Sequence, residues 1–363
     1  MVTKRLLALD VLRGLTIALM VLVNTPGSWS HVYAPLLHAP WNGCTPTDLV
    51  FPFFLFIVGT SMWYSFKKYG SGLSSSGLKK VFKRFLIIYL LGLFLNVFPN
   101  FDFENIRIYG VLQRIAIAYA IAAVLCMKFN PKQLVYIALA LLVSYWAIIH
   151  FGGTYDLEGN IVRKLDLFLF GENHIYGGYG IPFDPEGLLS SIPSIVTVLV
   201  GYFAGSIIDK SSDVKAGIKK LILFGIVLVI VGKIWDLGFP INKPLWSSSY
   251  VIYTGGLAML FLALLLWLID VKQLKKAFTP FIHFGTNPLF IYVLSGMIGG
   301  ILGFVKVTNS SGSEVRLLSF YYSDFLVPLF GNLNGSLVYA ISHVVFLWII
   351  AFILYRKKIF IKI

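Results

Sequence analysis

Residues 48–66 read DLVFPFFLFIVGTSMWYSF, and Asp48 at the start is their only charged residue. A helix needs about 20 predominantly apolar residues to cross the hydrocarbon core of a bilayer. The stretch meets this requirement and predicts a transmembrane helix.

The composition of the whole chain supports the same class of protein. Of its 363 residues, 58% are hydrophobic and 13% are charged, whereas soluble domains carry about 25% charged residues. Cys44 and Cys126 are the two cysteines, so a disulfide scaffold is not implied. The chain is therefore predicted to be a polytopic membrane protein.

We predict about ten transmembrane helices that form one all-α bundle over residues 1–363. The first follows Lys4 and Arg5 and lacks a small-residue cleavage site, so we expect a retained helix and not a signal peptide. The apolar stretch 317–330 is shorter and is expected to be a re-entrant or surface helix. The predicted spans lie near residues 7–26, 48–66, 81–99, 109–127, 133–150, 188–208, 219–236, 247–269, 281–303 and 335–355.

The charged residues orient these spans. Ten spans place both termini on one side, and that side receives 21 of the 30 basic residues and three acidic ones. The other side receives eight basic and 12 acidic residues. Because positively charged loops stay in the cytoplasm, both termini are predicted to be cytoplasmic. The basic excess then reflects topology, and no nucleic-acid partner is expected.

The loops on the predicted outer side are long and polar, in contrast to the short basic loops inside. They cover residues 27–47, 151–187, 237–246 and 304–334. Long loops in compact proteins usually carry function, so we expect the binding chemistry at the outer face.

Two charged residues lie within the first predicted span. Asp10 and Arg13 are three residues apart and therefore share a helix face. Charges inside a span usually pair or line a cavity. One interpretation is a structural ion pair near the inner interface, and the other is that Arg13 meets an anionic ligand entering from the cytoplasm.

The segment from Asn24 to Pro52 concentrates polar and aromatic residues between the first two spans. It contains His38, Trp41 and Asp48. Taken alone, a single histidine is more often an ordinary loop residue, and an interfacial tryptophan is often a membrane anchor.

Three further runs place polar residues at the outer ends of spans. Arg107, Gln113 and Arg114 lie around the start of the fourth span. Arg107 suits snorkelling to the interface, whereas Arg114 is deep enough to face the bundle interior. The other two runs contribute Asp184 and Glu186, and Lys243 and Trp246.

These last four residues allow two interpretations each. Acidic residues at a helix start are common caps, and carboxylates beside aromatic rings also suit an amino sugar. Lys243 and Trp246 either bind sugar or anchor the interface. The six histidines and two cysteines show no metal-ligand spacing, so no metal is expected.

Six motifs occur in the order found in one known family. They are LDVLRG with Asn24, HAPWNG followed by DLVFPFFLFIVG, RIYGVLQR, FDPEGLLSSIPSI, PINKPLWSSSYV and the terminal LYRKKIFIKI. With these motifs the chain resembles the heparan-α-glucosaminide N-acetyltransferases, lysosomal membrane enzymes with bacterial relatives. The family's extra amino-terminal lumenal domain and its preceding span are not found here, as in the bacterial branch.

The resemblance implies an acetyl-CoA-dependent N-acetyltransferase that acts on a terminal glucosamine across the membrane. It assigns the active-site histidine to His38 and a nearby asparagine to Asn24. The expected acceptor is an amino sugar or a heparan-derived oligosaccharide. The protein is expected in the bacterial inner membrane, within the lipid bilayer and as a homodimer.

From this we expect His38 to act as a general base and Asn24 to stabilise the tetrahedral oxyanion. A covalent acetyl-histidine intermediate is the alternative mechanism. Acetyl-CoA is expected near Arg13, Gln113 and Arg114. The acceptor sugar is expected near Trp41, Asp184, Glu186, Lys243 and Trp246.

A different class of function is an amino-sugar transporter with His38 in a binding or proton-relay role, since intramembrane charges suit both classes. A non-catalytic scaffold fits poorly with such charges and with the polar outer loops.

Overall fold

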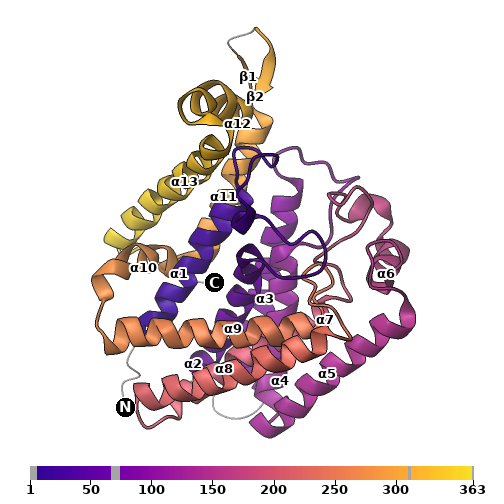
Figure 1. Cartoon of the computed structure of the whole chain (residues 1–363), viewed down its shortest axis with the longest axis vertical. Coiled ribbons are helices and arrows are strands. Elements are labelled where there is room, and N and C mark those ends of the chain that lie inside the picture. Colours follow the sequence, from indigo (N-terminus) through magenta and orange to yellow (C-terminus); the bar gives the residue numbers. More distant parts are fainter. Residues whose placement is uncertain (1–5, 67–73, 310–311, 362–363) are drawn as a thin grey trace.

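The computed structural model describes residues 6–66, 74–309 and 312–361. Five basic residues used in the topology prediction lie outside this part of the chain, namely Lys4, Arg5, Lys67, Lys68 and Lys362. The regular secondary structure of the described part is helical apart from one short antiparallel hairpin. The all-α prediction is thereby confirmed (Figure 1).

The helices differ widely in length. The α-helices are α1 (Leu7–Asn24), α2 (Val50–Phe66), α3 (Ser75–Val97), α4 (Val111–Lys128), α5 (Pro131–Gly152), α6 (Ile161–Phe170), α7 (Ser191–Asp209), α8 (Val214–Asp236), α9 (Ser248–Leu266), α10 (Thr279–Thr286), α11 (Pro288–Phe304), α12 (Leu317–Phe320) and α13 (Val327–Arg356). The other elements are η1 (Ala34–Leu36), η2 (Pro46–Leu49), η4 (Glu172–His174), η5 (Trp267–Val271), η6 (Lys275–Phe278), η7 (Tyr321–Leu326), β1 (Lys306–Thr308) and β2 (Glu314–Arg316).

The helices confirm an integral, multi-pass membrane protein. Among the described residues, seven helical stretches are long and apolar enough to cross a bilayer, or eight if one bent pair forms a single span. Helices α3 and α8 fall outside this set. Both have 23 residues, but lysines cluster near their starts. The count of ten spans stays a prediction.

One predicted span is broken. The stretch 281–303 was expected as a single helix, but α10 and α11 meet at an angle of 75°. Asn287 between them has non-helical dihedrals (φ −132°, ψ 52°). It precedes Pro288, and a proline disfavours helical geometry in the residue before it. The break brings the Asn287 side chain to the carboxyl-terminal segment, where it donates to Ile359 O (2.9 Å) and accepts from Ile361 N (2.7 Å).

The stretch 317–330 precedes a break in the long last helix, and its re-entrant or surface position stays a prediction. Gly331 interrupts α13 with φ 74° and ψ 172°. Positive φ values favour glycine because it has no Cβ. The separate stretch contains α12 and the π-helical η7.

Close helix packing depends on small residues, as is common in membrane bundles. A Cβ on Gly59 of α2 would lie 1.8 Å from Val198 O of α7, and one on Gly201 of α7 would lie 1.9 Å from Phe56 O of α2. Neither glycine therefore tolerates a side chain without separating the helices.

Four segments far apart in sequence meet at one end of the bundle. The segment 25–49 joins α1 to α2, and the segment 98–110 joins α3 to α4. Gly43 N donates to Ile241 O (2.7 Å), which connects the first segment to the 237–247 loop. Ile108 N donates to His174 O (3.0 Å), which connects the second to the 153–190 segment. Figure 1 shows α6, which belongs to the 153–190 segment, at the right-hand edge of the molecule.

Candidate active site

The segment 38–48 is shaped by one buried carboxylate. Asp48 lies in η2, just before α2, and is 1% exposed. Its Oδ2 accepts hydrogen bonds from Ala39 N, Thr45 N and Thr45 Oγ1, each 3.0 Å long. Thr45 and Asp48 thereby form a capping box at the start of η2. These donors hold the carboxylate plane in one orientation.

The other oxygen of Asp48 faces His38. His38 Nδ1 lies 2.7 Å from Asp48 Oδ1, and 42% of the His38 side chain is exposed. Because an ionised carboxylate only accepts hydrogen bonds, the proton of a neutral His38 is on Nδ1. Its Nε2 therefore carries the free lone pair, as a general base requires.

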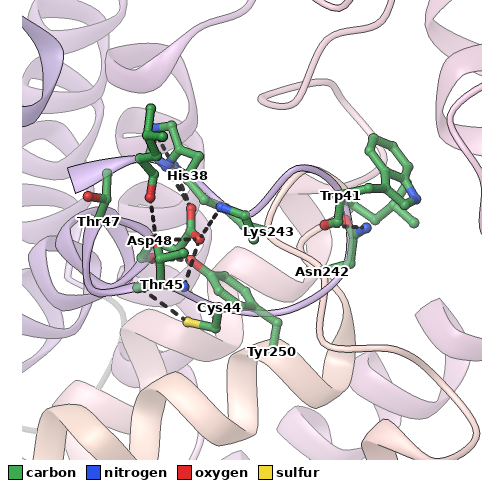
Figure 2. A network of polar contacts seen from close by, with 12 residues as sticks. His38, Trp41, Cys44, Thr45, Thr47, Asp48, Asn242, Lys243 and Tyr250 are labelled. Carbon is green, nitrogen blue, oxygen red and sulfur yellow. Dashed lines mark hydrogen bonds and ion pairs between the residues drawn. The ribbon is translucent and has the colours of Figure 1, made fainter. Parts of the chain in front are cut away.

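A lysine from a distant loop completes this cluster (Figure 2). Lys243 Nζ lies 3.0 Å from His38 Nδ1 and 3.3 Å from His38 Nε2. It is also 3.5 Å from Asp48 Oδ1. Burial lowers the pKa of Lys243, while the Asp48 charge opposes that effect. Lys243 is a predicted sugar-binding residue, and the structure places it directly against His38.

The position of Lys243 is fixed by its neighbour. Asn242 is 1% exposed, and its amide donates to Trp41 O (3.1 Å) and Asn42 Oδ1 (3.0 Å). Its own Oδ1 accepts from Leu245 N (2.7 Å). Asn242 thus joins the 237–247 loop to the segment that carries His38.

Two further groups surround the cluster without supplying a nucleophile. Tyr250 of α9 donates its hydroxyl to Asp48 O (2.5 Å) and supports η2 from below. Burial, and then the charge of Asp48, raise the pKa of Cys44 to about 12. The Cys44 thiol therefore stays protonated at neutral pH and is a poor nucleophile.

Asn24 does not contact this cluster. It is the last residue of α1 and is exposed, and within the described part of the chain it makes no hydrogen bond with His38. The predicted oxyanion role of Asn24 stays a prediction that requires a bound substrate between the two side chains.

The two carboxylates predicted to bind the acceptor are engaged by Arg107. Arg107 Nε and Nη2 donate to Asp184 (2.8 and 2.6 Å), and Nη2 also contacts Glu186 Oε2 (2.6 Å). Burial lowers the pKa of Arg107, but the two carboxylates outweigh this effect and raise it. Asp184 has no exposed surface, so a direct contact with an acceptor requires Arg107 to move.

The two predicted tryptophans lie in different environments. Trp41 is half-buried beside the outer loops, and its ring packs edge-on against Tyr179 and Phe183. Trp246 is 1% exposed and donates to Thr197 Oγ1 (3.2 Å) in the bundle interior. The structure therefore does not bring Trp41 and Trp246 to one open pocket.

Arg13 lines a cavity at the other end of α1. It donates to Ser61 Oγ (2.7 Å) and pairs with Asp10 (3.1 Å). The cavity has a volume of about 580 Å³, and Arg84, Tyr119 and other residues of α1 to α4, α10 and α11 also line it. The two interpretations of Arg13, an ion pair with Asp10 and contact with an anionic ligand, are therefore compatible. The Arg13 side chain makes the ion pair and also lines the cavity.

The other two residues predicted to bind acetyl-CoA are behind the cavity wall. Leu112 and Ile115 of α4 line the cavity, whereas Gln113 and Arg114 are at most 1% exposed. Arg114 donates to Ser190 Oγ and lies 4.9 Å from the centre of the Trp246 ring.

Asp48 and Arg84 were missed as site residues. Asp48 belongs to a quoted motif, and its position just before an apolar helix was a usable signal. Among the described residues, no group of three His, Cys, Asp or Glu residues could hold a metal ion.

The chain is similar to known proteins over almost its whole length. Residues 5–238 match the family profile "Heparan-alpha-glucosaminide N-acetyltransferase, catalytic". The mouse protein named heparan-alpha-glucosaminide N-acetyltransferase is 30% identical over 424 residues, which cover 99% of this chain and 61% of the relative. The human protein of that name is 30% identical over 426 residues, with 99% and 60% covered. The chain thus spans about three fifths of the length of these relatives.

Proposed function

The chain belongs to the heparan-α-glucosaminide N-acetyltransferase catalytic family, and from this we propose that it transfers an acetyl group from cytoplasmic acetyl-CoA to the amine of a glucosamine-type sugar on the outer side of the membrane. The observation that carries the proposal is the His38–Asp48 pair, with a Nδ1–Oδ1 distance of 2.7 Å. It provides a partly exposed base at the end of the bundle opposite the Arg13 cavity.

The proposed chemistry begins with the acceptor bound as its free, unprotonated amine. The acceptor amine attacks the thioester carbonyl carbon, and His38 Nε2 takes the proton that the nitrogen loses. Asp48 stabilises the resulting imidazolium. When the tetrahedral oxyanion collapses, the C–S bond breaks and CoA leaves as a thiolate. Asn24 is the proposed donor to the oxyanion.

The proposed donor site is the cavity lined by Arg13 and Arg84. Its volume of about 580 Å³ falls within the usual range of small-molecule sites, and guanidinium groups suit the phosphates of CoA. Arg13 and Asn24 are 11 residues apart on α1, which corresponds to a rise of about 16 Å. The acetyl-bearing arm of CoA would cover this distance while its nucleotide stays at the cavity. Gln113 and Arg114 are buried behind the α4 residues that line the cavity, so they would affect acetyl-CoA binding indirectly.

The proposed acceptor site surrounds the exposed face of His38. Trp41 provides an aromatic face, Lys243 borders the base, and Glu186 is 9% exposed beside Arg107. Asp184 would contribute by holding Arg107 in place, and Trp246 would contribute by anchoring the 237–247 loop.

The competing function, an amino-sugar transporter, is separated by one assay. Purified protein in detergent is mixed with labelled acetyl-CoA and with glucosamine, glucosamine oligosaccharides or unrelated amines. The enzyme releases CoA and forms an acetylated sugar without any gradient, and loss of the general base in His38→Ala slows this reaction by at least about 10²–10⁴-fold. Transport of unmodified sugar in sealed vesicles, with no acetyl transfer in detergent, would support the transporter instead.

The same assay addresses the covalent alternative. Direct transfer releases CoA only when the acceptor is present. A stoichiometric burst of CoA from wild-type protein without acceptor, absent in His38→Ala, would establish the acetyl-histidine route.

A further inference from the structure

The position of Lys243 relative to the His38 ring is unusual for a hydrogen-bonded lysine. Its Nζ is nearly equidistant from the two ring nitrogens, at 3.0 and 3.3 Å. A point in the ring plane at these distances would overlap the ring carbon between the nitrogens. The amine therefore lies over the face of the imidazole, where a cation contacts the π system.

Lys243 and His38 also share one carboxylate oxygen. Asp48 Oδ1 lies 2.7 Å from His38 Nδ1 and 3.5 Å from Lys243 Nζ, while the other oxygen is fully used by loop donors. With Lys243 charged and His38 neutral, the three groups sum to zero charge. Protonation of His38 adds a second positive charge beside the first.

We propose that Lys243 is a positioning residue that keeps His38 in its neutral, proton-accepting form by competing for Asp48 and by placing a positive charge over the imidazole face. The proposal rests on the role of His38 in the proposed function. It assigns to Lys243 an effect on the base in place of a direct contact with sugar.

The surroundings of His38 contain few other charges that would alter this balance. Asp48 comes from η2 and Lys243 from the 237–247 loop. Glu186 lies further out and interacts electrostatically with Lys243, but it is paired with Arg107. Burial raises the pKa of the Cys44 thiol to about 12, so the thiol is neutral at physiological pH. The Tyr250 hydroxyl carries no charge near pH 7, because a phenol ordinarily ionises at a pKa of about 10. The charge of the cluster is thus set by Asp48, Lys243 and His38.

The test measures the protonation of His38 without any substrate. Diethyl pyrocarbonate acylates neutral imidazole, so the pH dependence of His38 modification between pH 5 and 8, followed by mass spectrometry, gives a midpoint. The exposed His150 is an internal reference in the same sample. The variants are Lys243→Met, Lys243→Gln, Lys243→Arg and Asp48→Asn. Lys306→Met, which removes an exposed lysine paired with Glu314, is the matched control.

We expect the midpoint to rise by about one pH unit in Lys243→Met and Lys243→Gln, as loss of an adjacent unit charge at a partly exposed site implies. Lys243→Arg should preserve the wild-type midpoint, and Asp48→Asn should lower it. A midpoint in both neutral variants that coincides with that of wild type, or falls below it, would overturn the proposal. Two neutral variants keep the test available if one of them does not fold.

Turnover is measured separately on the same proteins. The acidic limb of the pH profile of kcat/KM should shift together with the midpoint of His38 modification, because that limb reports the ionisation of groups in the free enzyme. A shifted midpoint with an unshifted acidic limb would support the effect of Lys243 on His38 and contradict the general-base role of His38. The two failures are therefore distinguishable.

Discussion

Replacing Asp48 by asparagine should block the base nitrogen of His38 while leaving the loop folded. The three donors to Oδ2 require an acceptor, so the asparagine oxygen must take that position. The reverse orientation would deprive the partly buried N–H groups of Ala39 and Thr45 of an acceptor. At about 1–3 kcal/mol for each lost partner, it costs about 2–6 kcal/mol. The amide NH₂ is thus directed at His38 Nδ1.

An NH₂ group facing Nδ1 selects the His38 tautomer that carries its proton on Nε2. That tautomer has no lone pair toward the acceptor, and the stabilising charge of Asp48 is also lost. We expect turnover to fall by about 10²–10⁴-fold, the usual contribution of general-base catalysis. Acetyl-CoA binding should persist, because Arg13 and its cavity are at the other end of α1.

The measurement is the steady-state rate of acetyl transfer in detergent, with acetyl-CoA affinity and thermal unfolding measured on the same preparations. Thr45→Ala is the matched control, since it removes one donor to Oδ2 and keeps the Asp48 charge. One lost hydrogen bond is worth about 1 kcal/mol, so its rate should change by less than about tenfold. If Asp48→Asn is as active as Thr45→Ala, the tautomer argument is refuted.

Three further predictions concern the surroundings of the site. Arg107→Met should destabilise the protein by about 3–5 kcal/mol, because it leaves Asp184 buried without its cation; chemical unfolding in detergent measures this, and Arg107→Lys should recover part of the loss. Burial raises the pKa of Asp166 from 3.8 to about 7. The stability that this shift contributes is therefore fully present below pH 3.8 and is lost as the pH rises through 7. Thermal unfolding across this pH range should show the loss in wild type and not in Asp166→Asn. Arg13→Ala should weaken acetyl-CoA binding, measured by calorimetry, more than it affects acceptor affinity; equal losses for both ligands would indicate a structural ion pair.

The sequence was sufficient for the fold class because the bilayer imposes a simple requirement. A run such as 48–66 must be helical in lipid, since its backbone polar groups have no water to bond. The break at Asn287 was less visible, although Pro288 marks it. The sequence stays apolar on both sides of the break, because α10 and α11 together are as hydropathic as a membrane-spanning helix. Periodicity and composition therefore did not reveal the 75° bend.

The candidate site was only partly predictable for a related reason. His38 was identified because its motif carries a family resemblance, and Lys243 was named from its position in another motif. Their contact could not be predicted, since it depends on the buried amide of Asn242 joining two loops about 200 residues apart. Likewise, the pairing of Asp184 and Glu186 with Arg107 could not be predicted, because Arg107 comes from the distant 98–110 segment.

The sequence by itself determined that the chain is an all-helical membrane protein of an acetyltransferase family, and that His38 belongs to a polar segment between the first two apolar stretches. These properties depend on composition, on apolar runs and on motifs, which are local and readable along the chain. Only the tertiary structure decided which charges are paired, that Asp48 orients His38, and that Lys243 lies over its ring. Those relations depend on distances between side chains from separate loops, and the packing of α1, α2, α7 and α9 sets these distances.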